Sequence, residues 1–295
     1  MPFWQLTVPA TADTSDGLTN FLWEQGALGV VEEQRPGHPP SLRAFFAETV
    51  SSTGLLSAVH GYQASLRALG FSLAPDTAEI APLLDEAWAS AWQQSFPIRE
   101  VGRRLLVMPP WLAEPAPPSA SGERLAVVIE PGRAFGTGHH GTTEGCLVLL
   151  EDALEAAPGS RMLDIGTGTG ILAIAALRLG ASGALAIDTD PDAVAAAQVN
   201  AARNDCAGLE VRLAEPQDVD GRFPLVVANL LTHAHLALAA QYARLVSPAG
   251  HLVLGGMLDG EDARVAQALA GLGFGTRWCV PIDGWASLLL AAPSH

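Results

Sequence analysis

A glycine-rich turn followed by an aspartate one strand later is the feature of this sequence most able to do chemistry. Residues 161–165 (RMLDI) predict a strand, GTGTG follows at 166–170, and the apolar run ILAIAALRL then predicts a helix. Glycines at such a turn let backbone N–H groups approach a ligand at the helix N-terminus. Asp188 ends the next predicted strand, where a carboxylate can bind both hydroxyls of a ribose. The pattern therefore predicts an adenosine-type ligand.

Two ligands of that type compete for the turn, a nicotinamide dinucleotide and S-adenosylmethionine. The dinucleotide fingerprint is GxGxxG, in which an open helix end receives a pyrophosphate. Here the run is DxGxGxG, with Asp164 two residues before the first glycine. A carboxylate in that place disfavours a pyrophosphate and favours the ammonium group of a methionine moiety. The sequence thus favours S-adenosylmethionine, with Asp164, Gly166, Gly168 and Asp188 as cofactor-binding residues.

Asn229 ends the strand predicted at 224–229 and is followed by two leucines. A side-chain amide at the carboxyl end of a parallel strand faces the ligand crevice, where a buried amide needs partners. Many amino-methylating enzymes have Pro-Pro and an aromatic residue after this position, and they grip a planar amide or exocyclic amine. Leu-Leu instead leaves room for a flexible alkyl amine. We expect Asn229, with its own carbonyl and that of Leu230, to line the acceptor channel, and these two residues are the catalytic candidates.

The elements that must position these residues alternate regularly after residue 124. Such alternation predicts a parallel sheet covered on both faces, a doubly wound or Rossmann-like α/β domain. The last two strands are separated only by IDGW and must form an antiparallel hairpin. The candidate strands are 161–165, 183–188, 209–214, 224–229, 250–255, 276–281 and 286–292, with a helix between each of the first five pairs.

The amino-terminal part predicts a smaller α+β domain of ferredoxin-like type, because its elements follow the order βαββαβ. A helical stretch at 82–96, a strand at 105–108 and a Pro/Ser/Gly-rich segment at 109–123 without regular structure follow it. The predicted strands are 3–8, 28–33, 42–47 and 71–80, and the helices are 16–26 and 54–69. We expect three parts: the ferredoxin-like domain at 1–82, a linker helix, strand and Pro-rich segment at 83–123, and the α/β domain at 124–295.

The composition narrows the class of partner. Sixteen arginines and no lysine stand against 31 acidic residues, and the formal net charge is −15. This charge repels phosphate backbones, so no direct nucleic-acid binding is expected and a cationic partner is favoured. The absence of lysine excludes a P-loop lysine and Schiff-base catalysis. Without a secretion signal, a membrane span or paired CxxC cysteines, the sequence favours a cytoplasmic protein.

A histidine pair, His233 and His235, could suggest a metal site together with His139 and His140. We reject it, because a helix that begins at residue 232 places positions i and i+2 on different faces. No metal is expected.

Three motifs together resemble the ribosomal protein L11 methyltransferase (PrmA) family of class I S-adenosylmethionine-dependent methyltransferases. They are IEPGRAFGTGHHGTTEG at 129–145, LDIGTGTGILAIAA at 163–176 and VVANLL at 226–231. The match by sequence covers residues 82–295, and the amino-terminal part resembles the family's substrate-recognition domain in size and predicted topology. The resemblance implies a seven-stranded methyltransferase domain. Family members often have His-Pro-Thr-Thr where this chain has Gly141 after the histidine.

Carried over by position, the resemblance implies that Thr143 contacts the cofactor, and that Asn229 is a cofactor-binding residue near the reacting methyl group. It also implies that Phe135 and His140 wall the site. For His140, packing within the loop is an equal alternative. The resemblance further implies methyl transfer from S-adenosylmethionine, with S-adenosylhomocysteine as product, to lysine side-chain amines and the N-terminal α-amine of ribosomal protein L11, up to trimethylation. The partner would be that protein, free or early in assembly. The alternatives are a class I methyltransferase for another protein or a small-molecule amine, and a non-catalytic adenosine-binding assembly factor.

Overall fold

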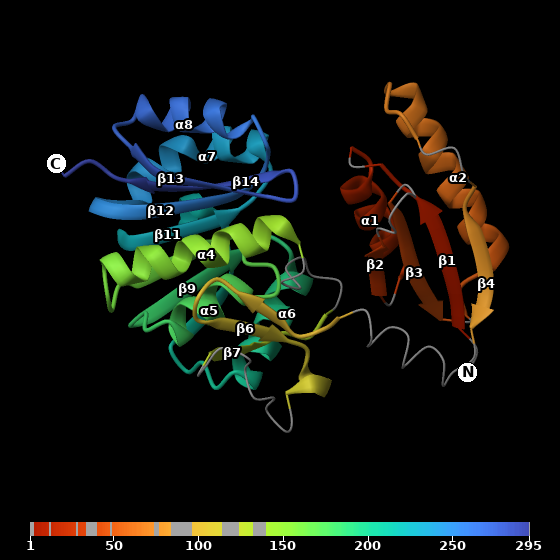
Figure 1. Ribbon diagram of the computed structural model, residues 1–295, viewed down its shortest axis with the longest axis horizontal. Coiled ribbons are helices and arrows are strands. Elements are labelled where there is room, and N and C mark those ends of the chain that lie inside the picture. Colours follow the sequence, from red (N-terminus) through yellow and green to blue (C-terminus); the bar gives the residue numbers. More distant parts are fainter. Residues whose placement is uncertain are drawn as a thin grey trace. The chain divides into compact units, whose positions relative to one another are not determined.

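A computed structural model of the chain describes residues 3–11, 13–27, 29–33, 40–47, 49–73, 77–83, 96–113, 124–131 and 140–294. The chain divides into two compact units, Met1–Pro97 and Ile98–His295 (Figure 1). The predicted helix at 82–96 falls almost entirely outside the described residues. The predicted domain limits at 82 and 123 stay predictions.

The first unit contains a four-stranded antiparallel sheet in the order β2-β3-β1-β4, and the helices described in it, α1 and α2, contribute to one apolar core. This arrangement confirms the predicted βαββαβ order. The strand predicted at 71–80 is wrong in its start, because Gly70 ends α2 with a left-handed φ of +91° and the Phe71 N–H still bonds back to Leu66. The elements are β1 (Phe3–Pro9), α1 (Ser15–Glu24), β2 (Gly29–Glu33), β3 (Ser41–Ala47), α2 (Ser52–Ala68) and β4 (Glu79–Leu83).

The second unit contains the predicted doubly wound sheet, in the order β10-β9-β8-β11-β12-β14-β13. The first five strands are parallel, and β14 runs antiparallel to both β12 and β13, which confirms the hairpin. The strands are β8 (Arg161–Ile165), β9 (Gly183–Asp188), β10 (Leu209–Leu213), β11 (Phe223–Asn229), β12 (Val246–Leu258), β13 (Gly275–Ile282) and β14 (Trp285–Ala291). The helices are α4 (Gly141–Ala156), α5 (Ile171–Arg178), α6 (Pro191–Arg203), α7 (Thr232–Leu245) and α8 (Asp262–Ala270).

Apolar side chains cover both faces of this sheet, as predicted. Met162 and Val227 pack with α4 and α5, whereas their neighbours Leu163 and Val226 pack with α7 and α8 on the opposite face. One predicted helix is wrong: β10 and β11 are joined by η2, a single 3-10 turn at Pro216–Asp218. The connection is too short for a full crossover helix, and a proline opens it.

A small third sheet joins β5 (Arg99–Val101), β6 (Leu105–Met108) and β7 (Leu125–Val128). It confirms the strand predicted at 105–108. Residues 109–113, the described part of the start of the segment predicted to lack regular structure, include a 3-10 turn, η1, at Pro110–Leu112, where two prolines favour the tight turn. In the parts of the chain that the structure describes, no helix has the length and apolarity to cross a membrane.

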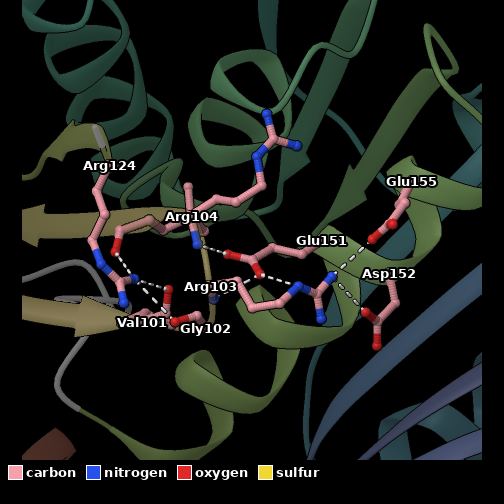
Figure 2. A network of polar contacts seen from close by, with 9 residues as sticks. Val101, Gly102, Arg103, Arg104, Arg124, Glu151, Asp152 and Glu155 are labelled. Atoms are coloured by element: carbon pink, nitrogen blue, oxygen red, sulfur yellow. Dashed lines mark hydrogen bonds and ion pairs between the residues drawn. The ribbon is translucent and has the colours of Figure 1, made fainter. Parts of the chain in front are cut away.

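A buried carboxylate ties this small sheet to α4. Glu151, 1% exposed, accepts the backbone N–H groups of Arg103 (2.8 Å) and Arg104 (2.9 Å) in the turn between β5 and β6. Figure 2 shows the Arg103 guanidinium reaching Asp152 and Glu155 on the same helix. Since backbone donors need partners when buried, Glu151 fixes the turn against the helix. The other end of α4 carries the threonines of the candidate site.

Candidate functional site

The glycine turn lies between the ends of two neighbouring strands. The N–H groups of Gly166 and Thr167 donate to the Ile187 carbonyl of β9 at 2.9 and 3.0 Å. Gly166 has a φ of +72°, and a Cβ there would come within 2.7 Å of the Leu230 side chain. The left-handed conformation therefore favours glycine, and the missing Cβ lets the Leu230 side chain approach closely. The geometry brings the turn and Leu230 together.

Asp188 closes the turn at the end of β9. One of its carboxylate oxygens accepts the Gly168 N–H at 2.9 Å, and the other accepts the Asp190 N–H at 3.0 Å. The carboxylate is therefore fixed at the carboxyl edge of the sheet, next to the strand order reversal where ligands of doubly wound folds bind. A ribose contact at Asp188 stays a prediction.

Asp164 is fully buried at the end of β8. Its Oδ2 accepts the Thr167 hydroxyl at 2.7 Å, whereas its Oδ1 has no hydrogen-bond partner in the described part of the chain. Burial raises the pKa of Asp164 to about 7 and the charge of Asp188 adds to this, whereas hydrogen bonding from Thr167 and from the Ala173 backbone opposes it. A cation beside the free oxygen would favour the ionised form, so the group is suited to an ammonium partner.

Asn229, at the end of β11, is bound to the first turn of α4. Its Nδ2 donates to the hydroxyl of Thr142 at 3.2 Å and to that of Thr143 at 3.4 Å. These contacts leave the Oδ1 buried and without a partner among the described residues. A buried amide oxygen in this state has an unused capacity to accept a hydrogen bond, and a ligand N–H group could use it. Thr142, which the sequence did not single out, thus belongs to the same cluster.

His140 begins α4. Its Nδ1 accepts the Thr142 N–H and bonds to the Thr142 hydroxyl at 2.9 Å, and its ring packs 4.9 Å from that of Trp285. The structure therefore gives His140 a capping and packing role, and a contact with substrate stays a prediction. Phe135, like His139, lies outside the described residues.

Two further glycines, which the sequence reasoning missed, shape the site from β12. A Cβ on Gly255 would lie 3.0 Å from Asn229 Oδ1 and would overlap Cys146 Sγ. Gly256 has a φ of +83°, and a Cβ there would overlap the Leu230 carbonyl. A paired glycine inside a strand pattern marks such a close approach, and this signal was present in LVLGGML.

The two histidines of the H-x-H pair lie apart on α7. His233 is exposed, whereas His235 is fully buried. The His235 ring bonds to the Tyr242 hydroxyl at 2.9 Å and to the Gly255 carbonyl at 2.8 Å. Its nitrogens are thus engaged inside the fold.

The sheet order, the edge hairpin, and the glycine turn with an acidic residue one strand away define a class I methyltransferase fold. A family model described as ribosomal protein L11 methyltransferase (PrmA) matches residues 2–292. The chain belongs to the ribosomal protein L11 methyltransferase family. This assignment confirms the family resemblance seen in the motifs.

Relatives across the full length agree with it. The ribosomal protein L11 methyltransferase of Marinobacter nauticus is 34% identical over 280 residues, 91% of each chain. That of Geobacter metallireducens is 35% identical over 300 residues, 98% of this chain and 97% of the relative. A crystal structure of ribosomal protein L11 methylase from Lactobacillus delbrueckii subsp. bulgaricus matches with a TM-score of 0.61 and 30% identity, over 67% of this chain and 100% of that one.

Proposed function

We propose that this protein transfers methyl groups from S-adenosylmethionine to lysine side-chain amines and the N-terminal α-amine of ribosomal protein L11. The observation that carries the proposal is the meeting of the glycine turn with Asn229 and Leu230 at one edge of the sheet. Membership of the L11 methyltransferase family supports the choice of acceptor protein. The chemistry of each residue supports the choice of donor.

The residues at the turn fit S-adenosylmethionine. Asp188 would bind the ribose hydroxyls, the turn at Gly166 and Gly168 would lie against the nucleoside, and the unpaired Oδ1 of Asp164 would accept the ammonium of the methionine part. Thr143 would contact the same ligand from α4. When bound, the donor supplies a methyl group already activated by its sulfonium, so the proposed reaction requires no metal.

The acceptor amine must be neutral to attack. A lysine amine with a pKa near 10.4 loses its proton at about pH 7.4 at a cost of about 4 kcal/mol, and an α-amine near pKa 8 is easier by about 3 kcal/mol. Desolvation in the channel and the nearby sulfonium both lower the amine pKa. Both classes of amine are therefore within reach of one site.

Asn229 would hold the amine in line. Its Oδ1 would accept one N–H of the neutral amine and so direct the nitrogen lone pair toward the methyl carbon. The new N–C bond forms as the C–S bond breaks, and the proton of the resulting ammonium passes to solvent. Proximity and orientation supply about 7 to 11 kcal/mol, so no strong general base is required. Repetition on one amine would yield the trimethyl product. The neutral dimethylamine that accepts the third methyl has no N–H, so Asn229 would direct only the first two transfers in this way, and the third transfer releases no proton.

The acceptor would be bound as a free protein or early in ribosome assembly, in the cytoplasm. A formal net charge of −15 attracts a lysine-bearing partner at long range and disfavours RNA. Residues 1–82, which contain the ferredoxin-like sheet, would form the recognition domain.

Intact-mass analysis of unmethylated L11, incubated with enzyme and donor, tests this proposal. We expect mass increments of one CH2 unit, up to three for each modified amine. A substrate with a blocked N-terminus would lose only the α-amine increments. Asn229→Ala should lose transfer, whereas His233→Ala, an exposed change on α7, should not. An L11 mass that stays unchanged with the wild-type enzyme would refute the proposal.

A further inference from the structure

We propose that His235 is a positioning residue for methyl transfer, which holds the Asn229–Leu230 segment in its reactive conformation through the Gly255 carbonyl. The inference rests on the proposed function and adds a residue to it. His235 itself lies within α7 and would touch neither donor nor acceptor.

The hydrogen bonds of His235 fix one form of its ring. The Gly255 carbonyl, 2.8 Å from Nε2, can only accept, so Nε2 carries the hydrogen. In the neutral ring Nδ1 is then an acceptor, and the Tyr242 hydroxyl, 2.9 Å away, donates to it. Burial lowers the pKa of His235 to about 4, which keeps this neutral form near physiological pH. The ring is therefore held with its N–H aimed at Gly255.

The Gly255 carbonyl connects this ring to the candidate catalytic residues. It also accepts the Leu230 N–H at 3.0 Å, and Gly255 faces Asn229 in the pairing of β11 with β12. The Gly255 carbonyl oxygen thus accepts two hydrogen bonds, one from the His235 ring and one from the Leu230 backbone N–H, between the end of β11 and the start of α7. The overlap that a side chain on Gly256 would make with the Leu230 carbonyl shows how closely the two segments are packed.

The surroundings of His235 argue against a packing role alone. Tyr242, its partner, is part of an apolar cluster with Leu245, Leu254 and Val265. An aliphatic side chain in such a place avoids the cost of burying polar groups. A polar ring whose two nitrogens are both hydrogen-bonded has a fixed orientation instead, and this orientation directs its N–H at the Gly255 carbonyl. We therefore expect the ring to matter more for the rate of transfer than for donor binding.

Kinetics of three variants of the full-length enzyme test the role, with S-adenosylmethionine and L11. His235→Leu removes both hydrogen bonds at similar volume, His235→Gln keeps an N–H donor for Gly255, and His233→Leu is the matched exposed control. A misplacement of the reacting groups costs up to about 100-fold in rate, so we expect kcat of the leucine variant to fall about 10- to 100-fold. KM for the donor should change little. The glutamine variant should recover most of the rate.

A spectroscopic readout separates this proposal from the proposed function. The side-chain amide resonance of Asn229, measured by NMR with S-adenosylhomocysteine present, should shift in His235→Leu and stay near its wild-type position in His235→Gln and His233→Leu. If wild-type enzyme did not methylate L11, the proposed function would fail while this resonance still reported the positioning.

Two results would overturn the role of His235. One is an unchanged Asn229 resonance and unchanged kcat in the leucine variant. The other is an equal loss of rate and thermal stability in the leucine and glutamine variants, which would indicate packing alone. Should His235→Leu fail to fold, His235→Met gives the same test, because its flexible side chain fills a similar volume and likewise donates no N–H to the Gly255 carbonyl. An unaltered Asn229 resonance in that variant would contradict the proposal.

Discussion

Replacing Asp164 with asparagine should stabilise the ligand-free protein at alkaline pH. Burial raises the pKa of Asp164 from 3.8 to about 7. The folded state thus holds the proton more tightly than the unfolded state, so the contribution to stability is full below pH 3.8 and is lost as the pH rises through about 7. Three pKa units correspond to about 4 kcal/mol at 1.36 kcal/mol per unit, which is the upper limit of the penalty in alkaline solution. Asparagine carries no charge and avoids it.

Urea denaturation of both proteins at pH 5 and pH 8.5 measures this effect. Much of the penalty develops between these two values, so the stability advantage of Asp164→Asn should grow by up to about 3 kcal/mol. Groups such as His235 titrate in both proteins and cancel in the difference. Asp220→Asn is the matched control, because Asp220 is exposed and its replacement should gain nothing. An advantage that does not depend on pH would refute the reasoning.

The same change should weaken donor binding. Loss of a charge-assisted hydrogen bond costs about 1.5 to 3 kcal/mol, or about 10- to 100-fold in Kd for S-adenosylmethionine. Titration calorimetry measures this, and equal affinity in the two proteins would remove Asp164 from the donor site. Asp164 would then be a group that lowers stability without serving the site.

Three further predictions concern the support of the site. Glu151→Ala should lower the free energy of unfolding by about 1–3 kcal/mol for each backbone N–H that loses its acceptor, as measured by urea denaturation. A decrease of less than about 1 kcal/mol would contradict the buried contact. Gly256→Ala should lower the melting temperature and the transfer rate, because the new Cβ overlaps the Leu230 carbonyl; wild-type values would show that β12 adapts freely. Burial lowers the pKa of His235 from 6.5 to about 4, so its contribution to stability is lost as pH falls from 6.5 toward 4, by up to about 3 kcal/mol. The free energy of unfolding of His235→Leu, measured by urea denaturation at several pH values, should depend less on pH in this range. An unchanged pH dependence would contradict the burial of a neutral ring.

The sheet could be predicted because its strands carry their own signals. Parallel strands buried on both faces are continuous apolar runs, as in LVVA of β11, and IDGW allows only a tight hairpin. The prediction of a helix between β10 and β11 was wrong, because the connection between these strands is too short to hold one. The start of β4 was predicted too early, because the chain leaves α2 through the left-handed conformation of Gly70, which the sequence pattern did not indicate.

The candidate site could be predicted only in part, because much of it depends on contacts between strands. The glycine turn and Asp188 are visible in the sequence, since both lie at strand ends of one βαβ unit. Gly255 and His235 come together only because β12 lies beside β11 and α7 packs across them. The spacing of residues along the chain does not indicate that contact. The H-x-H pattern is more typical of a metal site.

A crystal structure of the enzyme with S-adenosylhomocysteine tests the central claim most directly. It should show the ribose hydroxyls on Asp188, the amino group facing Asp164, and the sulfur beside the Asn229 side chain. A nucleoside bound elsewhere, or bound at the turn with its sulfur directed away from Asn229, would contradict the account.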